Sequence, residues 1–302
     1  MEKAVVFGGS GFIGSHVADN LADRGYKVSV FDKQKSPYLS GAKEFVQGDI
    51  LNKKEVEKTV KGSDIIYNFA GEADIDNALV SPLDTITTNI IGNTNILEAC
   101  RKHSVKRFVF ASTVYVYSNS GSFYRSSKQA CELIIEDYHK HYGFDFTILR
   151  YGTLYGPRAD RRNWLYSALK DAIEKKCITR KGDGEEIREY VHVYDAANLS
   201  VEILKEKYKN QYVMITGNQQ IRIKDLMKMV QEILGKSVKL KFMKSDQEQH
   251  YEITPYNFSP KLAKKIVGDH YIDLGQGVLD LINLLYVNLN HKGERDIKKS
   301  NL

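Results

Sequence analysis

The sequence predicts an α/β protein built on a doubly wound parallel (Rossmann) sheet with a smaller C-terminal lobe. Three observations predict this fold class. Apolar runs rich in β-branched residues alternate with longer segments of helical period, the runs are continuously apolar, and three closely spaced glycines follow the first run. Continuous apolar runs are typical of strands covered on both faces, as in a parallel sheet.

Six strands and four helices are predicted in alternation along the first two thirds of the chain. The strands are expected at residues 4–7, 27–31, 64–69, 107–112, 146–151 and 211–216. The helices are expected at residues 16–25, 52–62, 88–103 and 128–143, some of them closed by a glycine at the C-cap. Such alternation favours right-handed crossovers between parallel strands.

The pattern becomes irregular from about residue 155 and then returns to the sheet. We expect a sheet domain from residues 1–154 plus 187–216 and a second lobe from residues 155–186 plus 217–290. Residues 291–302 are expected to form a flexible tail.

Composition excludes several classes of protein. The chain has 302 residues and a net charge of +6, but its lysines are scattered, which argues against a nucleic-acid partner. Cys100, Cys131 and Cys177 form no CxxC pair, so we expect a reducing compartment and no metal site or disulfide framework. No run is long and apolar enough for a signal peptide or a membrane span, and the expected location is cytoplasmic.

The glycines of VVFGGSGFIGSHVADNL, residues 5–21, predict a dinucleotide site. Gly8 allows a tight turn, Gly11 allows a pyrophosphate to approach the start of a helix, and Gly14 allows that helix to pack closely on the strand. Asp32, at the end of the second strand, can accept hydrogen bonds from a ribose and repel a 2′-phosphate, which favours NAD over NADP; Lys33 beside it weakens that preference. The alternative at this stage is a turn that is merely tight.

A Thr-Tyr-Lys set carries the chemistry. Tyr124 and Lys128 stand four residues apart on a predicted helix, so the ammonium can lie near the phenol and lower its pKa toward neutrality. The phenolate is then a general base for a sugar hydroxyl, and Thr113 at a strand end can hydrogen-bond the same oxygen. The alternative is that Tyr124 and Lys128 are ordinary surface residues of a helix.

The order of the motifs resembles the extended short-chain dehydrogenase/reductase superfamily, in its branch of NAD-dependent nucleotide-sugar epimerases and dehydratases. The motifs that carry the resemblance are the GxxGxxG turn, GDI (48–50), NFAGEAD (68–74), FASTVYVYS (110–118), YRSSK (124–128), LRYGTLYGPR (149–158) and GDGEEIREYVHVYDAA (182–197). The resemblance implies that Thr113, Tyr124 and Lys128 are catalytic, with Lys128 also holding the nicotinamide ribose. It further implies cofactor contacts from Gly8, Ser10, Gly11, Phe12, Ile13, Gly14, Asp32, Lys33, Asp49, Ile50, Phe69, Ala70, Gly71, Tyr124, Lys128, Tyr151 and Gly152. Thr153 and Arg188, with Thr113, are implied for a nucleotide-diphosphate sugar bound at the lobe.

Departures from the family pattern narrow the reaction. Dehydratases of this branch carry Asp-Glu after the catalytic threonine and decarboxylases usually a glutamate, whereas Val114 and Tyr115 stand here. Thr113 and Tyr124 are also only eleven positions apart, which implies a short loop over the sugar.

The grip on the diphosphate departs from the pattern as well. Arg188 matches a family arginine that binds the diphosphate, and its alternative is an ion pair with Glu185, Glu186 or Glu189. A second family arginine is missing near residues 247–252; the alternatives are that His250, Lys241 or Lys244 substitutes for it, or that the phosphate grip differs.

The sequence therefore predicts an NAD-dependent nucleotide-sugar epimerase that acts through a transient 4-keto sugar. The alternatives are a 4-ketoreductase or dehydrogenase with the same three residues, and a catalytically silent cofactor-sensing or nucleic-acid-binding protein on this fold. The helices near residues 88–103 and 124–142 are apolar on more than one face, and the family resemblance implies a homodimer through a four-helix interface.

Overall fold

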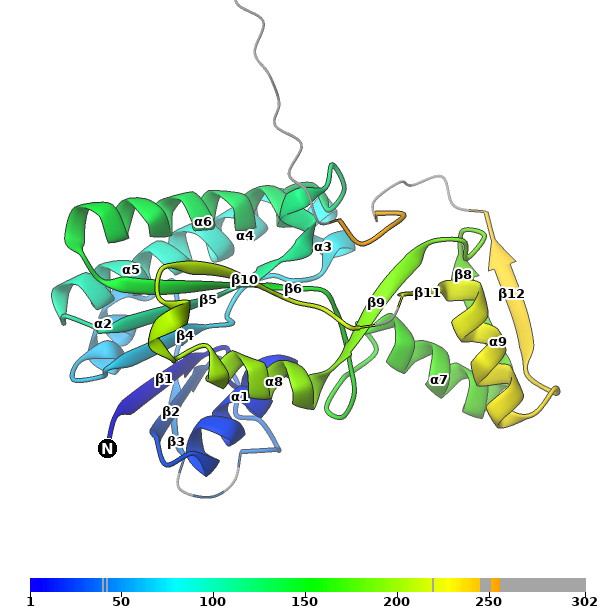
Figure 1. Ribbon diagram of the computed structural model, residues 1–302, viewed down its shortest axis with the longest axis horizontal. Helices are drawn as coiled ribbons and strands as arrows, with labels where there is room; N and C mark the ends of the chain where they lie inside the picture. Colours follow the sequence, from blue (N-terminus) through cyan, green and yellow to red (C-terminus); the bar gives the residue numbers. More distant parts are fainter. Residues whose placement is uncertain (40, 42, 219, 245–250, 256–302) are drawn as a thin grey trace, which may run out of the picture. The chain divides into compact units, whose positions relative to one another are not determined.

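The computed structural model describes residues 1–39, 41, 43–218, 220–244 and 251–255. Its largest sheet has seven strands in the order β10-β6-β5-β4-β1-β2-β3, and all neighbours in it are parallel (Figure 1). The strands are β1 (Lys3–Phe7), β2 (Lys27–Asp32), β3 (Glu44–Gln47), β4 (Ile65–Asn68), β5 (Arg107–Thr113), β6 (Asp145–Tyr151) and β10 (Gln211–Ile215). The predicted doubly wound parallel sheet is confirmed.

Helices cover both faces of this sheet (Figure 1). One face carries α2 (Lys53–Val60), α5 (Gly92–Lys102) and α6 (Ser122–Tyr142), and the other carries α1 (Phe12–Asp23) and α8 (Val193–Glu202). The short helices α3 (Ile75–Val80) and α4 (Pro82–Ile86) and a π-helical turn, η1 (Thr87–Ile91), lead into α5. A 3-10 turn, η2 (Val114–Tyr117), follows β5, and another, η3 (Glu206–Tyr208), precedes β10.

Alternate residues of each strand supply the two halves of the core. In β1, Val5 and Phe7 pack with α2, α5 and α6, whereas Ala4 and Val6 pack with α1 and α8. All four are at most 2% exposed. Burial on both sides explains why the strand sequences are continuously apolar.

The sequence did not predict strand β3. Its residues, EFVQ, are few, and none of them is fully buried, because β3 lies at the edge of the sheet beside β2. A short edge strand lacks the long apolar run that identifies a central strand.

The C-terminal lobe has two small sheets. Strand β9 (Ile187–His192) lies between β7 (Thr153–Tyr155) and β11 (Gln220–Arg222), and β8 (Cys177–Lys181) pairs with β12 (Lys239–Met243). Helices α7 (Trp164–Lys175) and α9 (Ile223–Leu234) pack together in a separate apolar cluster. Within the predicted return segment 187–216, β9 belongs to one of these small sheets and β10 joins the main sheet.

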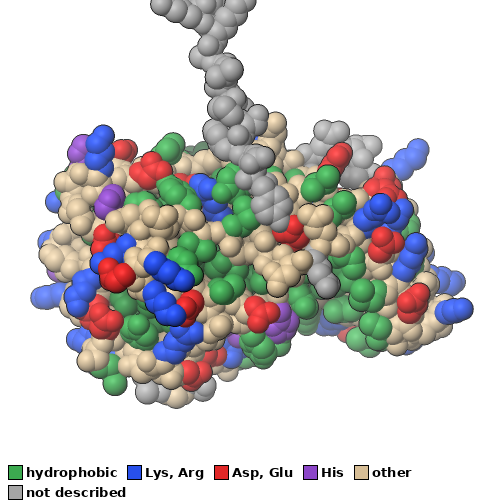
Figure 2. Space-filling view, viewed as in Figure 1, with side chains coloured by type: hydrophobic (Ala, Val, Ile, Leu, Met, Phe, Trp, Pro, Cys, Tyr) green, Lys and Arg blue, Asp and Glu red, His purple; other side chains and the backbone are tan. Residues whose placement is uncertain are grey.

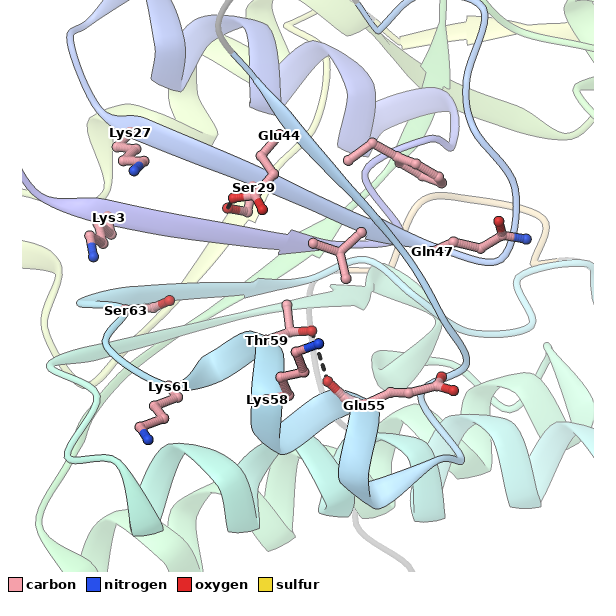
Figure 3. Close-up of a pocket in the computed structure, with 12 residues that line it drawn as sticks. Lys3, Lys27, Ser29, Glu44, Gln47, Glu55, Lys58, Thr59, Lys61 and Ser63 are labelled. Atoms are coloured by element: carbon pink, nitrogen blue, oxygen red, sulfur yellow. Dashed lines mark hydrogen bonds between the residues drawn. The ribbon is translucent and has the colours of Figure 1, made fainter.

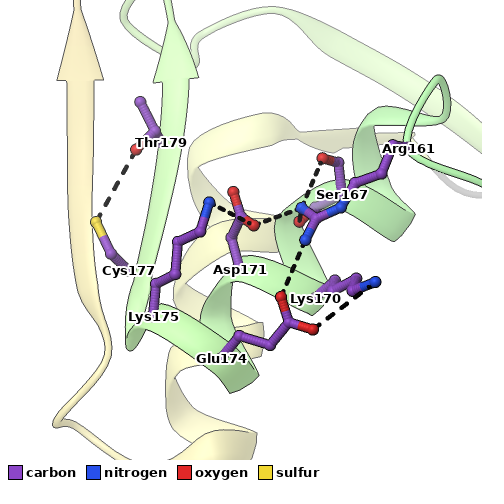
Figure 4. Close-up of polar contacts among 8 residues, drawn as sticks. All are labelled: Arg161, Ser167, Lys170, Asp171, Glu174, Lys175, Cys177 and Thr179. Atoms are coloured by element: carbon purple, nitrogen blue, oxygen red, sulfur yellow. Dashed lines mark hydrogen bonds and ion pairs between the residues drawn. The ribbon is translucent and has the colours of Figure 1, made fainter.

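A surface network holds the start of α7. Arg161 lies in the loop that precedes α7 and forms ion pairs with Asp171 and Glu174 of that helix. Its guanidinium also donates to Ser167 Oγ over 3.3 Å (Figure 4). Because these groups are largely exposed, the ion pairs contribute little free energy each, and the network mainly orients the loop.

Charges of both signs are interspersed over the face drawn in Figure 2, in line with the scattered lysines of the sequence. Within the described residues, no helix combines the length and apolar character needed to cross a membrane. Met1–Ser259 forms one compact unit, and the predicted boundaries between sheet domain and lobe stay a prediction.

Candidate active site

The turn after β1 brings backbone unusually close to backbone. Gly8 has φ +73°, and a Cβ on it would lie 2.5 Å from the Ala70 nitrogen. A Cβ on Gly14 would lie 2.3 Å from the Gly8 carbonyl oxygen, so α1 can sit on this turn only with glycine there. The GxxGxxG spacing thus has a steric cause in this fold.

Helix α1 begins in a way that suits a bound phosphate. Its N-cap is Gly11, no side chain caps it, and its first turn contains no acidic residue. The N–H groups of a helix's first turn have no partner inside the helix and carry a partial positive charge. This turn therefore fits the pyrophosphate of a dinucleotide, with Phe12 and Ile13 at the first helical positions.

Asp32 lies beside the glycine turn at the carboxyl end of β2. Its Oδ2 accepts a hydrogen bond from the Ser10 N–H (3.0 Å). Lys33 forms an ion pair with Asp49 (3.0 Å), and the pKa of that carboxyl is lowered by a hydrogen bond from Leu51 N–H and by Lys33, against its partial burial. Because Lys33 is paired with Asp49, it weakens the preference for NAD over NADP less than the sequence alone suggested.

The loop after β4 lies over the glycine turn, and a side chain from the π-helical turn holds it. Asn89 accepts from the Glu72 N–H (2.7 Å) and donates to the Glu72 carbonyl (3.0 Å) and to Ser127 Oγ (2.9 Å). A Cβ on Gly71 would lie 2.5 Å from Asn89 Oδ1, so Gly71 lets the loop approach this amide. The loop also contains Phe69 and Ala70, and π-helical turns are frequent at functional sites.

The structure brings Thr113, Tyr124 and Lys128 together. Thr113 ends β5, and Tyr124 and Lys128 project from the first two turns of α6. The Lys128 ammonium donates to the Ala111 carbonyl (2.7 Å) and lies 5.9 Å from the centre of the Tyr124 ring. Lys128 is only 6% exposed, so it is not the surface lysine of the alternative interpretation.

The pKa values of this set differ from the expectation. Burial raises the pKa of Tyr124 to about 12, with the Thr113 hydroxyl acting in the opposite direction. Burial lowers the pKa of Lys128 to about 8, which Cys131 and Glu132 partly oppose. The expectation that Lys128 brings the phenol toward neutrality is therefore wrong for the protein's own groups.

Two further tyrosines and Arg188 adjoin Tyr124. The Tyr115 ring lies 6.3 Å from the Tyr124 ring and 4.6 Å from the Tyr251 ring, centre to centre. The Arg188 guanidinium lies over the Tyr251 ring, 4.2 Å from its centre. The Tyr251 hydroxyl is 3.4 Å from Thr153 Oγ1. The residues implied for substrate therefore form one group with Tyr124, joined by Tyr251.

Arg188 does not form the ion pair of the alternative interpretation. It is 5% exposed, and its Nη1 donates to the carbonyls of Ile187 (2.9 Å) and Glu252 (3.4 Å). In the described part of the chain, no carboxylate lies within ion-pair distance of it. The three glutamates have other partners: Glu185 contacts Lys224, Glu186 contacts Arg180, and Glu189 accepts from Gln220.

Two of the predicted cofactor residues have buried side chains. The Tyr151 ring lies in the core under α8, with its hydroxyl 2.6 Å from Ser200 Oγ, so only its backbone and Gly152 stay at the strand end. Ile50 packs against Gly92 and its carbonyl accepts from Asn95, which leaves its side chain in the core. Contact of these two residues with the cofactor stays a prediction, and it would have to come from their backbone.

None of the three proposed substitutes for a second arginine is placed at the site by the described residues. Lys241 and Lys244 are exposed in and after β12. His250 lies outside the described residues.

A cavity of about 530 Å³ lies at the amino ends of β1 and β2, and none of the predicted site residues lines it (Figure 3). Lys3, Lys27, Lys58 and Lys61 surround it, with Glu44 and Glu55 between them. The carboxylates offset half of the lysine charge, so this cavity has no strong preference for anions.

Sequence reasoning missed Asn89 and Tyr251, and the paired Glu132 and Arg150 behind the site. Asn89 lies in a segment predicted as ordinary helix. Tyr251 lies in the stretch 247–252, which was considered only for a second diphosphate-binding cation. Their roles depend on contacts across 38 and 98 positions of sequence, between Asn89 and Ser127 and between Tyr251 and Thr153.

Together, the parallel sheet, the uncapped glycine turn and the Thr-Tyr-Lys set define a dinucleotide-dependent enzyme of the short-chain dehydrogenase type. Residues 4–215 match the NAD dependent epimerase/dehydratase family. The chain belongs to this family, which confirms the resemblance, the enzyme class and the NAD cofactor.

Individual relatives agree over most of the chain. The chain is 28% identical to a putative UDP-glucose 4-epimerase of Methanocaldococcus jannaschii, over 94% of this chain and 98% of the relative. It is similar to the crystal structure of UDP-glucose 4-epimerase with UDP-glucose from Thermotoga maritima (TM-score 0.78, 26% identity, 85% and 90% of the two chains). It is also similar to UDP-glucuronic acid 4-epimerase from Bacillus cereus in complex with UDP-glucuronic acid and NAD (TM-score 0.77, 27% identity, 86% and 95%).

The low pKa of Lys128 predicts a pH-dependent stability. Between the folded pKa of about 8 and the ordinary lysine pKa of 10.5, the unfolded chain binds more protons at Lys128, so the wild type gains stability as the pH rises. Lys128→Met removes this linkage. At pH 7 the free energy of unfolding should be higher for Lys128→Met than for the wild type. We expect this difference to shrink by on the order of 3 kcal/mol between pH 7 and pH 10.5.

Urea unfolding at both pH values measures this change, with the exposed Lys58→Met as the control for loss of any lysine. A difference between Lys128→Met and wild type that stays constant with pH would contradict the burial of a charged Lys128.

Proposed function

We propose that this enzyme is an NAD-dependent nucleotide-sugar 4-epimerase whose substrate is a UDP-hexose. The observation that carries the proposal is the meeting of Thr113, Tyr124 and Lys128 at the carboxyl edge of the sheet, next to the glycine turn. The UDP-sugars named for the relatives from Thermotoga maritima and Bacillus cereus support the nucleotide part.

The residues after Thr113 favour epimerisation over the other reactions of the family. Val114 is buried and Tyr115 faces Tyr124 and Tyr251 with an aromatic ring. No carboxylate follows Thr113 directly, so this strand end offers no acid-base pair for elimination of water. What remains is oxidation at C4 of the sugar and reduction of the 4-keto sugar.

Each residue has a distinct role in this proposal. Tyr124 takes the proton of the sugar 4-hydroxyl and returns it after the keto sugar has turned over, while Thr113 hydrogen-bonds the same oxygen. Lys128 places a positive charge near the phenol and holds helix α6 on β5. NAD, when bound, supplies the hydride acceptor and, in its oxidised form, a positive charge.

The cofactor and substrate contacts follow from the placement of the other residues. The first turn of α1 would hold the pyrophosphate, Asp32 the adenosine ribose and Lys128 the nicotinamide ribose. Arg188 and Thr153 would bind the substrate diphosphate, with Tyr251 stacked beside the guanidinium. Because burial raises the pKa of Tyr124 to about 12, the phenol needs positive charge nearby to act as a base.

Tyr124→Phe tests the proposal. We expect it to lower kcat for conversion of UDP-glucose to UDP-galactose about 10³-fold, because general acid-base catalysis is lost, with bound NAD unchanged. Anomeric proton NMR of the sugar measures conversion, and Tyr142→Phe at the exposed end of α6 is the matched control. Full activity of Tyr124→Phe would contradict the proposal, and accumulation of NADH with substrate would favour the ketoreductase or dehydrogenase instead.

We also propose a homodimer through the helices beside α6. Large apolar side chains stand exposed on helices that pack against one another: Leu79 (40%), Val80 (80%), Leu83 (74%), Ile86 (37%), Ile91 (49%), Phe123 (39%) and Leu133 (62%). Large exposed apolar side chains on neighbouring helices favour an interface, and a second copy of the chain would cover them with the same residues.

Charge on this face should separate the dimer. We expect Leu83→Asp and Leu133→Asp together to change the sedimenting species from two chains to one of 34.4 kDa, because burying two carboxylates per chain is unfavourable. Ile233→Asp, on an equally exposed apolar residue of α9, should leave the mass unchanged. A wild-type protein that sediments as a monomer, or a double variant that stays dimeric, would contradict this interface.

A further inference from the structure

A buried ion pair lies directly behind the Thr-Tyr-Lys set. Arg150 of β6 donates through Nε to Glu132 Oε1 (3.0 Å) and through Nη2 to Oε2 (2.6 Å). Glu132 of α6 is 5% exposed. Taking two charges out of water costs free energy that their attraction often does not recover, so the pair is a poor device for stability alone.

The pair is fixed on every side. Ser112 donates from its hydroxyl to Glu132 Oε1 (2.5 Å). The guanidinium lies 4.6 Å from the centre of the Tyr117 ring and 4.4 Å from that of Tyr212, and it also donates to the Tyr117 hydroxyl (2.5 Å). These contacts join α6 to β5, β6, β10 and the turn after β5, which gives Glu132 little freedom to move.

The location of the pair matters for the reaction. Glu132 follows Lys128 by one turn on the same face of α6, and Ser112 precedes Thr113. The charged or titratable groups that act on Lys128 are Cys131 and Glu132, and both favour its charged form against burial. Burial raises the pKa of the Cys131 thiol to about 12, and Glu132 is the carboxylate of the two.

We propose that Glu132, held by Arg150, is a positioning residue for the reaction: it aligns α6 with β5 and supplies the negative charge that faces the buried Lys128 ammonium. This inference rests on the proposed function, since it assigns Glu132 its effect through Lys128 and Thr113. In this proposal Glu132 acts through Lys128 and Thr113, and Arg150 acts by holding Glu132.

The proposal predicts opposite effects for the two partners. Glu132→Gln keeps the shape but removes the negative charge, so Lys128 should lose its proton at a lower pH. Arg150→Met removes the positive charge and leaves Glu132, so Lys128 should keep its proton to the same or a higher pH. If the pair were merely structural, Glu132→Gln and Arg150→Met would lower the stability equally, and neither would change the titration of Lys128.

The experiment compares wild type, Glu132→Gln, Arg150→Met and the double variant. The double variant removes both buried charges, so it is expected to fold even where a single variant leaves one charge unpaired. Asp145→Asn is the matched control, because it removes an ion pair with Lys209 at the opposite end of the same strand. The two readouts are the pH profile of kcat with UDP-glucose and an NMR titration of ¹³Cε-labelled lysine, with the Lys128 signal assigned by Lys128→Arg.

We expect Glu132→Gln and the double variant to lower kcat about tenfold and to move both the alkaline limb and the Lys128 titration about one pH unit lower. Arg150→Met and Asp145→Asn should move neither to lower pH. A Lys128 signal that titrates alike in wild type, Glu132→Gln and the double variant would overturn the proposal. If the wild type converts no UDP-hexose, the proposed function fails, and the NMR titration alone still decides whether Glu132 acts on Lys128.

Discussion

The hydrogen bond from the Lys128 ammonium to the Ala111 carbonyl is the contact on which the site depends. It is 2.7 Å long, it is buried, and it joins the helix that carries Tyr124 to the strand that ends at Thr113. A lysine so deeply buried is stable only if its charge has partners. The Ala111 carbonyl, the Phe110 ring 4.7 Å away and the Glu132 carboxylate provide them.

The parallel sheet places this contact next to the cofactor turn. The strands of the main sheet that carry site residues run in one direction, so their carboxyl ends meet at the same edge. The glycine turn after β1, Asp32 after β2, the loop after β4 and Thr113 after β5 therefore share one edge. The lobe adds Arg188, and Tyr251 brings that arginine beside the tyrosines near Tyr124.

Local patterns in the sequence predicted much of this arrangement. Six of the seven strands are long apolar runs, and the glycine spacing and the four-residue step from Tyr124 to Lys128 are local features of the chain. Strand β3 was not predicted because it is short and lies at an edge, and the separate sheet of β9 was not predicted because pairing partners are not visible in a strand's own sequence. The same reason applies to Asn89, Tyr251 and the Glu132–Arg150 pair, whose contacts join distant segments. The pKa of Tyr124 was misjudged because sequence spacing shows a nearby lysine but not the depth of burial.

One measurement tests the central claim most directly: mass spectrometry of the small molecules released when the purified protein is denatured. The account predicts about one NAD or NADH per chain, since an epimerase recycles its cofactor in place. A Gly11→Asp variant, which puts a carboxylate where the pyrophosphate would lie, should release none. A native protein that releases no dinucleotide, or releases NADP, would contradict a retained NAD.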